Sequence, residues 1–364
     1  MRVARFHAPG DIRMEEAPEP EPGPGELLIR VRNCSACGTD VKILRHGHHH
    51  IVPPRVMGHE IAGEVVAGDV PGWAPGDRVQ VIAAIPCGEC AECRRGRMTV
   101  CARQESMGYH YDGAFAELMT VPAKVLAVDG VNRVPDGVSF AEASVAEPLA
   151  CVLNGQELAR VGAGDDVVVF GAGPVGCLHV RVARARGAGR IVLVDVNRDR
   201  LDRAAAVVRP DTALWAAPGV DVVEAVRDLT RGRGADVAIT ATASGTAQVQ
   251  AVRMAARSGR ISLFGGLPKD DPVISLDANL VHYRELTVVG ANGSSPAHNA
   301  TALAMIASGR VPVADLITHR LPLEELPAAL GLVARGEAIK VTVEPGADPR
   351  LVAPRTSPAM RSHA

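Results

Sequence analysis

The chain has 364 residues, of which 47% are hydrophobic and 22% charged, so it can bury the cores of two or at most three domains and is too apolar for a disordered protein. Its 39 lysines and arginines against 41 aspartates and glutamates give a formal charge of −2, which argues against a nucleic-acid partner because such proteins carry an excess of positive charge. Only 3% of the residues are aromatic, which disfavours surfaces that bind bases or sugars by stacking.

No uninterrupted apolar run approaches the ~18–20 residues of a membrane span, and the N-terminus holds no long apolar segment typical of a signal peptide. We therefore expect a cytoplasmic protein without membrane partners. In a reducing compartment, the eight cysteines are interpreted as metal ligands or packed thiols rather than as disulfides.

Residues 1–150 contain short strand-like segments and irregular loops, with little helical periodicity. After a Pro- and Glu-rich start, alternating residues predict a strand at 26–32, and two further runs predict strands at 61–67 and 78–84. Proline–glycine pairs mark turns between the last two runs. The pattern predicts a β-rich first domain.

The pattern changes after residue 150. Helical stretches begin at about residues 174 and 198, and short, wholly apolar runs predict buried strands at 166–170, 190–195, 236–240 and 260–264. Apolar strands that alternate with helices are typical of a parallel sheet in an α/β domain. From about residue 291 to 345 the signals are mixed, and the Pro- and Arg-rich end at 346–364 predicts a disordered tail.

Four cysteines lie close together in the sequence: Cys87, Cys90, Cys93 and Cys101. The Cys-x2-Cys steps, with glycines nearby, allow four thiolates to converge on one ion. Four sulfurs in a tetrahedron suit Zn²⁺ and complete its coordination sphere, so the spacing predicts a structural zinc site. An iron–sulfur cluster uses the same ligands and is the alternative metal centre. Packed free cysteines are the alternative without a metal.

A second group of metal-ligand residues is scattered along the chain. Cys37 precedes His59 by 22 residues, Glu60 follows His59 directly, and Glu147 lies far downstream in a Glu-Pro-Leu segment. One thiolate, one imidazole and one or two carboxylates would form an open zinc site with room for water or substrate. The spacing alone does not bring them together, and taken singly His59 is more often a buried histidine and Glu147 a surface or capping carboxylate.

A glycine-rich turn, Gly171-Ala-Gly173-Pro174-Val175-Gly176, follows an apolar strand and opens a predicted helix, and Asp195 ends the next strand. Such glycines let the backbone approach a pyrophosphate at a helix N-terminus, and the acidic residue accepts hydrogen bonds from a ribose 2′-hydroxyl. A carboxylate repels a 2′-phosphate, so NAD⁺ is favoured over NADP⁺, although Arg198 and Arg200 lie close by. An ordinary packing turn is the alternative without a ligand.

Together these motifs resemble the zinc-dependent medium-chain dehydrogenases, which include the alcohol, sorbitol and threonine dehydrogenases. The likeness covers about residues 1–345 and follows the order and spacing of the motifs. It implies an α/β protein with a GroES-like, β-rich catalytic domain at 1–150, a doubly wound, NAD-binding Rossmann domain at 151–290, and a return to the catalytic domain at 291–345.

The resemblance assigns the metal ligands position by position. Cys37, His59 and Glu60 match the catalytic-zinc positions of the family, and Glu147 matches the further ligand of the sorbitol and threonine types, where simple alcohol dehydrogenases have cysteine. The four cysteines at 87–101 match the structural zinc lobe. The resemblance therefore implies two zinc ions per chain.

Other positions match residues that contact substrate or cofactor. Thr39 corresponds to the hydroxyl that touches the substrate oxygen, and Asp195 and Arg200 correspond to positions that hold the adenosine ribose. One departure concerns the proton relay, which in the family often ends in a histidine where this chain has Lys42. The relay would run through Lys42, through water or through a histidine of the cluster at 46–50, for which a solvated loop is the alternative interpretation.

The resemblance implies reversible oxidation of a secondary alcohol, in which zinc polarises the substrate oxygen, Thr39 accepts its proton and NAD⁺ accepts the hydride. Glu147 and the segment 279–286, which resembles one in polyol-type relatives, favour a polyol, sugar alcohol or cyclitol. An amino alcohol such as threonine is the second candidate. A non-catalytic NAD(H)-binding sensor or scaffold is a third, against which the intact zinc positions argue. By the same resemblance we expect a homodimer or homotetramer.

Overall fold

The computed structural model describes residues 1–346 of the chain. The tail predicted at 346–364 lies, from residue 347 on, outside the described residues. The chain forms two compact units. The first combines Met1–Ala150 with the segment that begins at Ser294, and the second contains Cys151–Gly293. Within residues 1–346, no helix has the length and apolar character that crossing a membrane requires.

The first unit is built around a seven-stranded sheet. Its strands are β3 (Leu27–Ala36), β5 (Glu60–Ala67), β6 (Arg78–Val81), β9 (Leu118–Val121), β10 (Val131–Arg133), β17 (Ile317–Pro322) and β18 (Lys340–Glu344). The order is β10-β6-β5-β3-β18-β17, and β9 also pairs with β3. β3 lies inside the sheet because its alternate residues Leu27, Ile29 and Val31 are fully buried and require cover.

Two smaller sheets, ordered β2-β1-β4 and β7-β8, complete the strands of this unit. Their members are β1 (Arg2–Ala8), β2 (Asp11–Glu16), β4 (Arg55–Val56), β7 (Ala84–Ile85) and β8 (Glu105–Ser106). β1 carries Val3 and Phe6 into the core of the unit.

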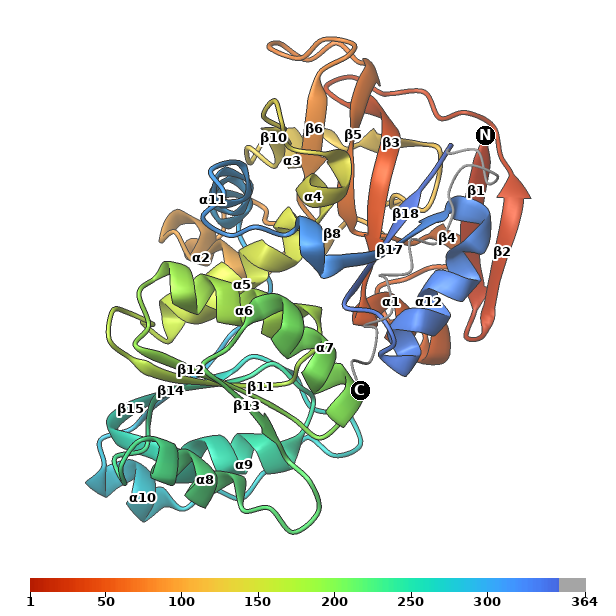
Figure 1. The fold of residues 1–364 in the computed structure, drawn as a ribbon. Coiled ribbons are helices and arrows are strands. Elements are labelled where there is room, and N and C mark those ends of the chain that lie inside the picture. The colour runs from red at the N-terminus through yellow and green to blue at the C-terminus, as the bar shows by residue number, and fades with distance from the viewer. Residues whose placement is uncertain (347–364) are drawn as a thin grey trace. The chain divides into compact units, whose positions relative to one another are not determined.

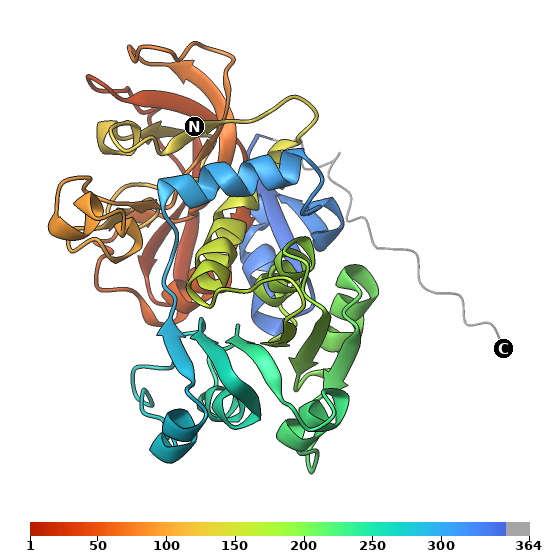
Figure 2. The same cartoon turned by 90° about the vertical axis from the view of Figure 1, so that its left-hand side faces the viewer.

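Short helices surround these sheets. They are α1 (Gly38–His46), α2 (Ala91–Arg94), α3 (Ala123–Leu126), α4 (Phe140–Ser144), α11 (Pro296–Ala307) and α12 (Leu326–Arg335), with 3-10 turns η1 (Met98–Val100), η2 (Ala314–Leu316) and η3 (Leu323–Glu325). Ser139 and Ser295 start α4 and α11 with capping boxes, which satisfy the free N–H groups of a first turn. α11 packs against α4 and β10, from which it is distant in the sequence, and crosses the upper half of Figure 2 in blue.

The second unit is a six-stranded sheet in which every pairing is parallel. Its strands are β11 (Asp166–Phe170), β12 (Arg190–Asp195), β13 (Thr212–Trp215), β14 (Ala235–Thr240), β15 (Ala255–Leu263) and β16 (Thr287–Gly290). Residues 167–169 and 191–194 are almost completely buried, as expected for strands covered on both faces. The strand order is β13-β12-β11-β14-β15-β16. Successive strands are added on one side of β11 up to β13 and on its other side from β14 on, and ligands bind at such a switch point between β11 and β14.

Helices cover both faces of this sheet. α6 (Pro174–Ala185) and α7 (Arg198–Val208) lie on one face, and α8 (Val222–Leu229), α9 (Gly245–Met254) and α10 (Ala278–Tyr283) lie on the other (Figure 1). α5 (Ala146–Leu158) begins in the first unit and continues into the second. The chain therefore passes from the first unit to the second within this helix, between Ala150 and Cys151.

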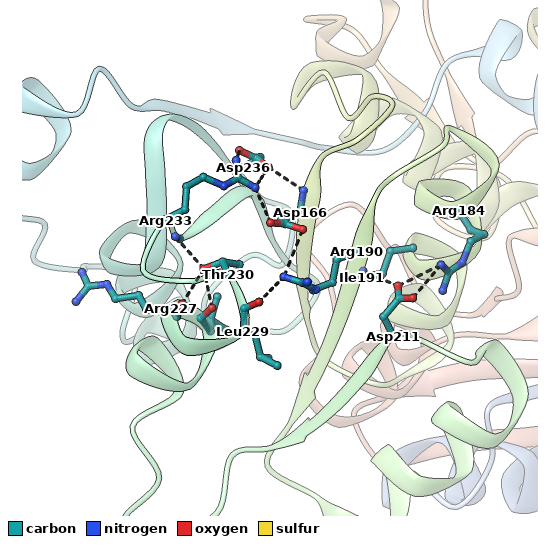
Figure 3. A network of polar contacts seen from close by, with 12 residues as sticks. Asp166, Arg184, Arg190, Ile191, Asp211, Arg227, Leu229, Thr230, Arg233 and Asp236 are labelled. Atoms are coloured by element: carbon teal, nitrogen blue, oxygen red, sulfur yellow. Dashed lines mark hydrogen bonds and ion pairs between the residues drawn. The ribbon is translucent and has the colours of Figure 1, made fainter.

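A polar network ties together the beginnings of β11, β12 and β14 (Figure 3). Arg233 contacts Asp166 at 2.6 Å and Asp236 at 2.8 Å, and the backbone N–H of Asp166 donates to Asp236 at 2.8 Å. Arg190 lies 3.8 Å from Asp166 and donates to the carbonyl of Leu229. Because parallel strands present their ligand sites at their carboxyl ends, this network at the opposite end is a structural feature.

In the first unit, β3 extends to Ala36 beyond the predicted strand at 26–32, and α1 and β6 also differ from the sequence predictions. The sequence analysis predicts no helix at the position of α1. Val41 and Ile43 are the only buried apolar residues of α1, so its sequence shows little helical periodicity. The strand predicted at 78–84 ends at Val81, because the chain then changes sheets and Ala84 begins β7, which pairs with β8. In the second unit, β11 and β12 have the predicted bounds.

Candidate functional site

The end of β3 lies between the first residues of β5 and β18. Ser35 of β3 pairs with Glu60 in one antiparallel ladder, and Ala36 pairs with Val341 in the other. β3 ends at Ala36. The register therefore brings the next residue, Cys37, to the edge of the sheet at which β5 and β18 begin.

Three of the predicted catalytic-zinc ligands meet at this edge. Ligand atoms of Cys37, His59 and Glu60 all lie within 4.8 Å of one another. His59 and Glu60 are buried, and Cys37 is half-buried. Gly58 makes the bend before His59 with a φ of 94°, and a β-carbon at this position would lie 2.8 Å from the Sγ of Cys34. Only glycine allows this approach without a displacement of the core.

Helix α1 starts at this cluster. Its N-cap is Cys37, whose Sγ accepts a hydrogen bond from the backbone N–H of Thr39 at 3.5 Å. The carboxylate of Asp40 accepts from the backbone N–H of Cys37 at 2.9 Å. This capping box fixes the Cys37 side chain and keeps the half-buried Thr39 in the first turn of the helix. Lys42 is exposed one turn further along α1.

Asp40 also orients the imidazole of His59. Its Oδ1 lies 3.3 Å from the Nδ1 of His59, and its side chain is only 1% exposed. Burial would lower the pKa of His59, but the charges of Asp40 and Cys37 outweigh it and raise this pKa well above its ordinary value. Metal-binding histidines usually present their second ring nitrogen to a carboxylate. The contact with Asp40 therefore leaves Nε2 as the atom that would bind a metal.

Lys340 is the buried counter-ion of Glu60. Its ammonium contacts Oε2 of Glu60 and donates to the carbonyl of Ala36 at 3.2 Å. Burial raises the pKa of Glu60 to about 7, with the charge of Lys340 opposing and that of Glu147 adding to the effect. Burial would also lower the pKa of Lys340, but Glu60 outweighs it and the pKa is raised. The ammonium therefore stays charged beside the cluster.

Glu147 lies in the first turn of α5 and is 8% exposed. It is outside the group of three residues whose ligand atoms lie within 4.8 Å of one another. Its charge is nevertheless close enough to raise the pKa of Glu60. The structure thus brings Cys37, His59 and Glu60 into one cluster and puts Glu147 near it.

The donor set of this cluster fits a zinc ion. A thiolate, an imidazole and a carboxylate are the ligand types of catalytic zinc sites, which keep one position for water or substrate. Oε1 of Glu60 is buried and has no hydrogen-bond partner within residues 1–346, whereas Oε2 contacts the ammonium of Lys340. Buried acceptors normally have partners, so Oε1 is suited to a cation.

The four predicted structural ligands form a second cluster in the first unit. The sulfur atoms of Cys87, Cys90, Cys93 and Cys101 all lie within 4.8 Å of one another, and three of the separations are 3.5, 3.9 and 4.0 Å. Sulfurs bound to zinc at about 2.3 Å in a tetrahedron lie about 3.8 Å apart. Backbone N–H groups lower the pKa of Cys90 to about 6, and burial raises that of Cys93 to about 12. The spacing fits a closed, structural zinc site.

The glycine turn joins β11 to α6 in the second unit. Gly173 is the N-cap of α6, and Pro174 occupies its first turn. A β-carbon on Gly176 would lie 1.7 Å from the carbonyl oxygen of Gly171, so the close packing of the helix on the turn requires glycine. The backbone N–H groups of Val175 and Gly176 belong to this helix N-terminus, which attracts the negative charge of a pyrophosphate.

Asp195 ends β12 beside this turn and is 5% exposed. Its two oxygens accept hydrogen bonds from the backbone N–H groups of Ala172 and Asn197, both at 2.7 Å, and Arg200 lies 3.6 Å from Oδ2. A cavity of about 380 Å³ is lined by Gly171, Asp195 and Arg200, among other residues of this unit. These groups fit the adenosine part of a dinucleotide.

The sequence analysis missed three residues that surround the catalytic cluster: Asp40, Tyr109 and Lys340. The ring centroid of Tyr109 lies 6.3 Å from that of His59. Lys340 carried a detectable signal, because a lysine at the start of the β-branched run Val-Thr-Val is unusual in a chain with only four lysines. Asp40 and Tyr109 stand in loops or helix starts where polar residues are common, and their roles depend on contacts distant in the sequence.

Two family models match the chain. The Alcohol dehydrogenase GroES-like domain matches residues 23–130, and the Zinc-binding dehydrogenase model matches residues 174–308. Together they cover more than half of the chain. They identify the first unit with a GroES-like domain and support the predicted Rossmann character of the second.

Characterised relatives align over nearly the whole chain. Sorbitol dehydrogenase of Halalkalibacterium halodurans is 31% identical over 347 residues, covering 94% of this chain and 98% of its own. L-threonine 3-dehydrogenase of Deinococcus radiodurans is 33% identical, with 94% and 98% covered. Erythritol/L-threitol dehydrogenase of Mycolicibacterium smegmatis is 33% identical, with 95% and 98% covered.

The fold is also similar to solved structures. A zinc-binding dehydrogenase from Sinorhizobium meliloti 1021 bound to NADP superposes with a TM-score of 0.85 at 31% identity, covering 94% of this chain and 99% of the other. The predicted family, the α/β fold class, and zinc and NAD(P) as cofactors are thereby confirmed. The chain belongs to the zinc-dependent medium-chain dehydrogenases, with a GroES-like catalytic domain and a Rossmann domain.

Proposed function

We propose that this enzyme transfers a hydride between NAD(H) and a secondary alcohol of the polyol, sugar alcohol or cyclitol class. The observation that carries the proposal is the cluster of Cys37, His59 and Glu60, with Glu147 near it. An open zinc site with a glutamate in the further ligand position fits the sorbitol and threonine types of the family. A sensor or scaffold would need neither this open metal site nor the Thr39 hydroxyl close to it.

Residues of the first unit have separate tasks in this reaction. When bound, the metal supplies a Lewis acid for the substrate hydroxyl and NAD⁺ supplies the hydride acceptor. Thr39 accepts the substrate proton and releases its own hydroxyl proton to water, and the ammonium of Lys42 is exposed three residues further on the same face of α1. Asp40 holds the imidazole of His59 in one orientation. Lys340 holds Glu60 in place beside the other ligands.

We propose NAD⁺ as the preferred cofactor. Asp195 is buried at the end of β12, and two backbone N–H groups fix its position. A 2′-phosphate would meet this fixed negative charge, whereas a ribose 2′-hydroxyl can donate to it. The guanidinium of the neighbouring Arg200 lies 3.6 Å from Oδ2 of Asp195. The carboxylate therefore offsets part of the positive charge that would otherwise attract a 2′-phosphate.

The substrate class is supported by the relatives that act on polyols. Sorbitol dehydrogenase and erythritol/L-threitol dehydrogenase are 31% and 33% identical to this chain. L-threonine 3-dehydrogenase is equally similar at 33%, so an amino alcohol is the second candidate. The segment 279–286, which favours the polyol type in the sequence, includes most of α10 in the second unit.

A substrate panel with NAD⁺ tests this proposal. Polyols, cyclitols and amino alcohols are offered to the zinc-loaded protein, and NADH formation is followed by absorbance. We expect oxidation of polyols or cyclitols, and loss of turnover in Cys37→Ala and His59→Ala variants whose circular dichroism matches the parent. Oxidation of amino alcohols alone would contradict the substrate class. Full activity in both variants would contradict the zinc site.

We further propose that the enzyme is a homodimer or homotetramer that works in the reducing cytoplasm. β16 is an edge strand of the second unit's sheet, with one side unpaired within residues 1–346, and unpaired strand edges are natural sites of association. Val273 and Tyr283, both in this unit, are 79% and 71% exposed. Thiolate ligands require reduced cysteines. Light scattering of the purified protein measures the oligomeric state. A monomer would contradict the proposed homodimer or homotetramer.

A further inference from the structure

Tyr109 lies beside the proposed zinc site but has no part in the function described so far. It belongs to the turn that follows β8, and its ring centroid is 6.3 Å from that of His59, with an angle of 61° between the planes. The backbone N–H of Ala114, just after this turn, donates to the carbonyl of Gly58 at 3.0 Å. The turn is therefore attached to the residue that directly precedes His59.

The turn that carries Tyr109 is held by several hydrogen bonds. The backbone N–H groups of Tyr109, His110 and Tyr111 are directed at the carbonyl of Ser106 at 3.4, 3.0 and 3.4 Å, and the N–H of Ser106 donates to Nδ1 of His110 at 3.1 Å. The hydroxyl of Tyr111 donates to Glu105 at 2.7 Å. The backbone position of Tyr109 is thus fixed by its neighbours rather than left to a mobile loop.

A cluster of imidazole rings packs against Tyr109. His48 lies edge-on to its ring, with a centroid distance of 4.9 Å and an angle of 87°. His49 and His50 follow at 4.5 and 5.4 Å from His48, and His110 lies 4.8 Å from His50. The histidine cluster therefore restricts the side chain of Tyr109, in addition to forming a solvated loop.

The side chain of Tyr109 is half-buried, and within residues 1–346 its hydroxyl has no hydrogen-bond partner. Burial raises the pKa of Tyr109 to about 12, with His59 opposing and Asp40, Cys37 and Glu147 adding to the effect. The phenol is therefore close to the charged groups of the zinc site and remains protonated near neutral pH. The hydroxyl is not among the fully buried polar atoms that lack a partner, so it is open to a ligand that can accept its proton.

We propose that Tyr109 is a specificity-determining residue, whose hydroxyl donates a hydrogen bond to a second substrate hydroxyl on the carbon next to the one that is oxidised. This inference rests on the proposed function and deepens it. A vicinal diol or polyol supplies the missing acceptor, whereas a monohydric alcohol leaves the phenol unpaired. In threonine, the carbon next to the one that is oxidised carries an ammonium group, which donates hydrogen bonds but cannot accept one. The phenol proton would therefore have no acceptor there either.

The test uses two substrates that share a carbon skeleton, 2,3-butanediol and 2-butanol, with the zinc-loaded full chain and NAD⁺. Tyr109→Phe removes the hydroxyl and keeps the ring. Tyr111→Phe makes the same chemical change two residues away, at a hydroxyl that bonds to Glu105, and is the matched control. In Tyr109→Phe we expect kcat/KM to fall about tenfold for the diol, the size of one lost hydrogen bond, and to stay within about twofold for 2-butanol.

A second measurement does not depend on turnover. The dissociation constant of 2,3-butanediol on the NADH-bound enzyme, obtained by saturation-transfer NMR, should rise by a similar factor in Tyr109→Phe and stay unchanged in Tyr111→Phe. Equal losses for both alcohols, no loss for the diol, or the same selective loss in Tyr111→Phe would overturn the role of Tyr109. A parent enzyme that oxidises neither the diol nor any polyol would instead refute the proposed function.

Discussion

His179 of α6 should make the second unit sensitive to acid. Its side chain is completely buried, Nε2 of Gln156 lies 3.3 Å from its Nδ1, and its ring packs edge-on against Phe264 with centroids 4.7 Å apart. Within the described part of the chain, its Nε2 has no hydrogen-bond partner. Burial lowers the pKa of His179 to about 3, so the ring is neutral in the folded protein, whereas an unfolded histidine titrates near about 6.5.

The sign and size of the effect follow from these two pKa values. Between them, the unfolded chain binds a proton that the folded chain does not, so stability falls as the pH falls. One pKa unit corresponds to about 1.4 kcal/mol. The cost of His179 is therefore close to zero at pH 8, about 2 kcal/mol at pH 5, and approaches about 5 kcal/mol below pH 3.

Urea unfolding at pH 8 and pH 5 measures this cost. His179→Gln and His179→Phe remove the titrating ring with different effects on packing, and comparing each protein with itself at two pH values cancels the packing difference. Between pH 8 and pH 5, both variants should lose about 2 kcal/mol less of unfolding free energy than the parent. An equal loss in the parent and both variants would refute the reasoning.

Three further perturbations address the other sites. Cys90→Ser removes one of four clustered sulfurs and should lower the melting temperature by roughly 5–10 °C; an unchanged value would contradict a structural metal. Lys340→Met leaves Glu60 buried without its counter-ion and should lower the unfolding free energy by about 3–5 kcal/mol, largely recovered when Glu60→Gln is added; a loss below about 1 kcal/mol would contradict the pairing. Asp195→Asn removes the charge that repels a 2′-phosphate and should shift the ratio of kcat/KM for NADP⁺ over NAD⁺ by about tenfold; steady-state kinetics that show no shift would argue against NAD⁺ selection by Asp195.

Motifs that are compact in the sequence could be predicted from the residues alone. The four cysteines at 87–101 are close enough to converge through local turns, and their sulfurs do form a cluster. The glycine turn follows β11 and opens α6, as its position between an apolar strand and a helix predicts. In both cases the spacing of the residues in the sequence is short enough to determine how they lie in the structure. Zinc and NAD(P) as the cofactors follow from the family to which the chain belongs.

Contacts between distant segments could not be predicted in this way. Cys37 and His59 meet because β3 and β5 pair in one particular register, which the spacing of 22 residues does not determine; the resemblance to a family supplied it. Lys340 reaches Glu60 through the pairing of β18 with β3, about 300 residues along the chain. Tyr109 stands in a turn without periodicity. The complete ligand set, including Glu147, remains a prediction.

The most direct test of the central claim is the metal content of the purified protein. The account predicts two zinc ions per chain, one for each cluster of ligand atoms, and one zinc ion in the folded Cys37→Ala and His59→Ala variants. A parent protein without zinc, or variants that keep both ions, would contradict it.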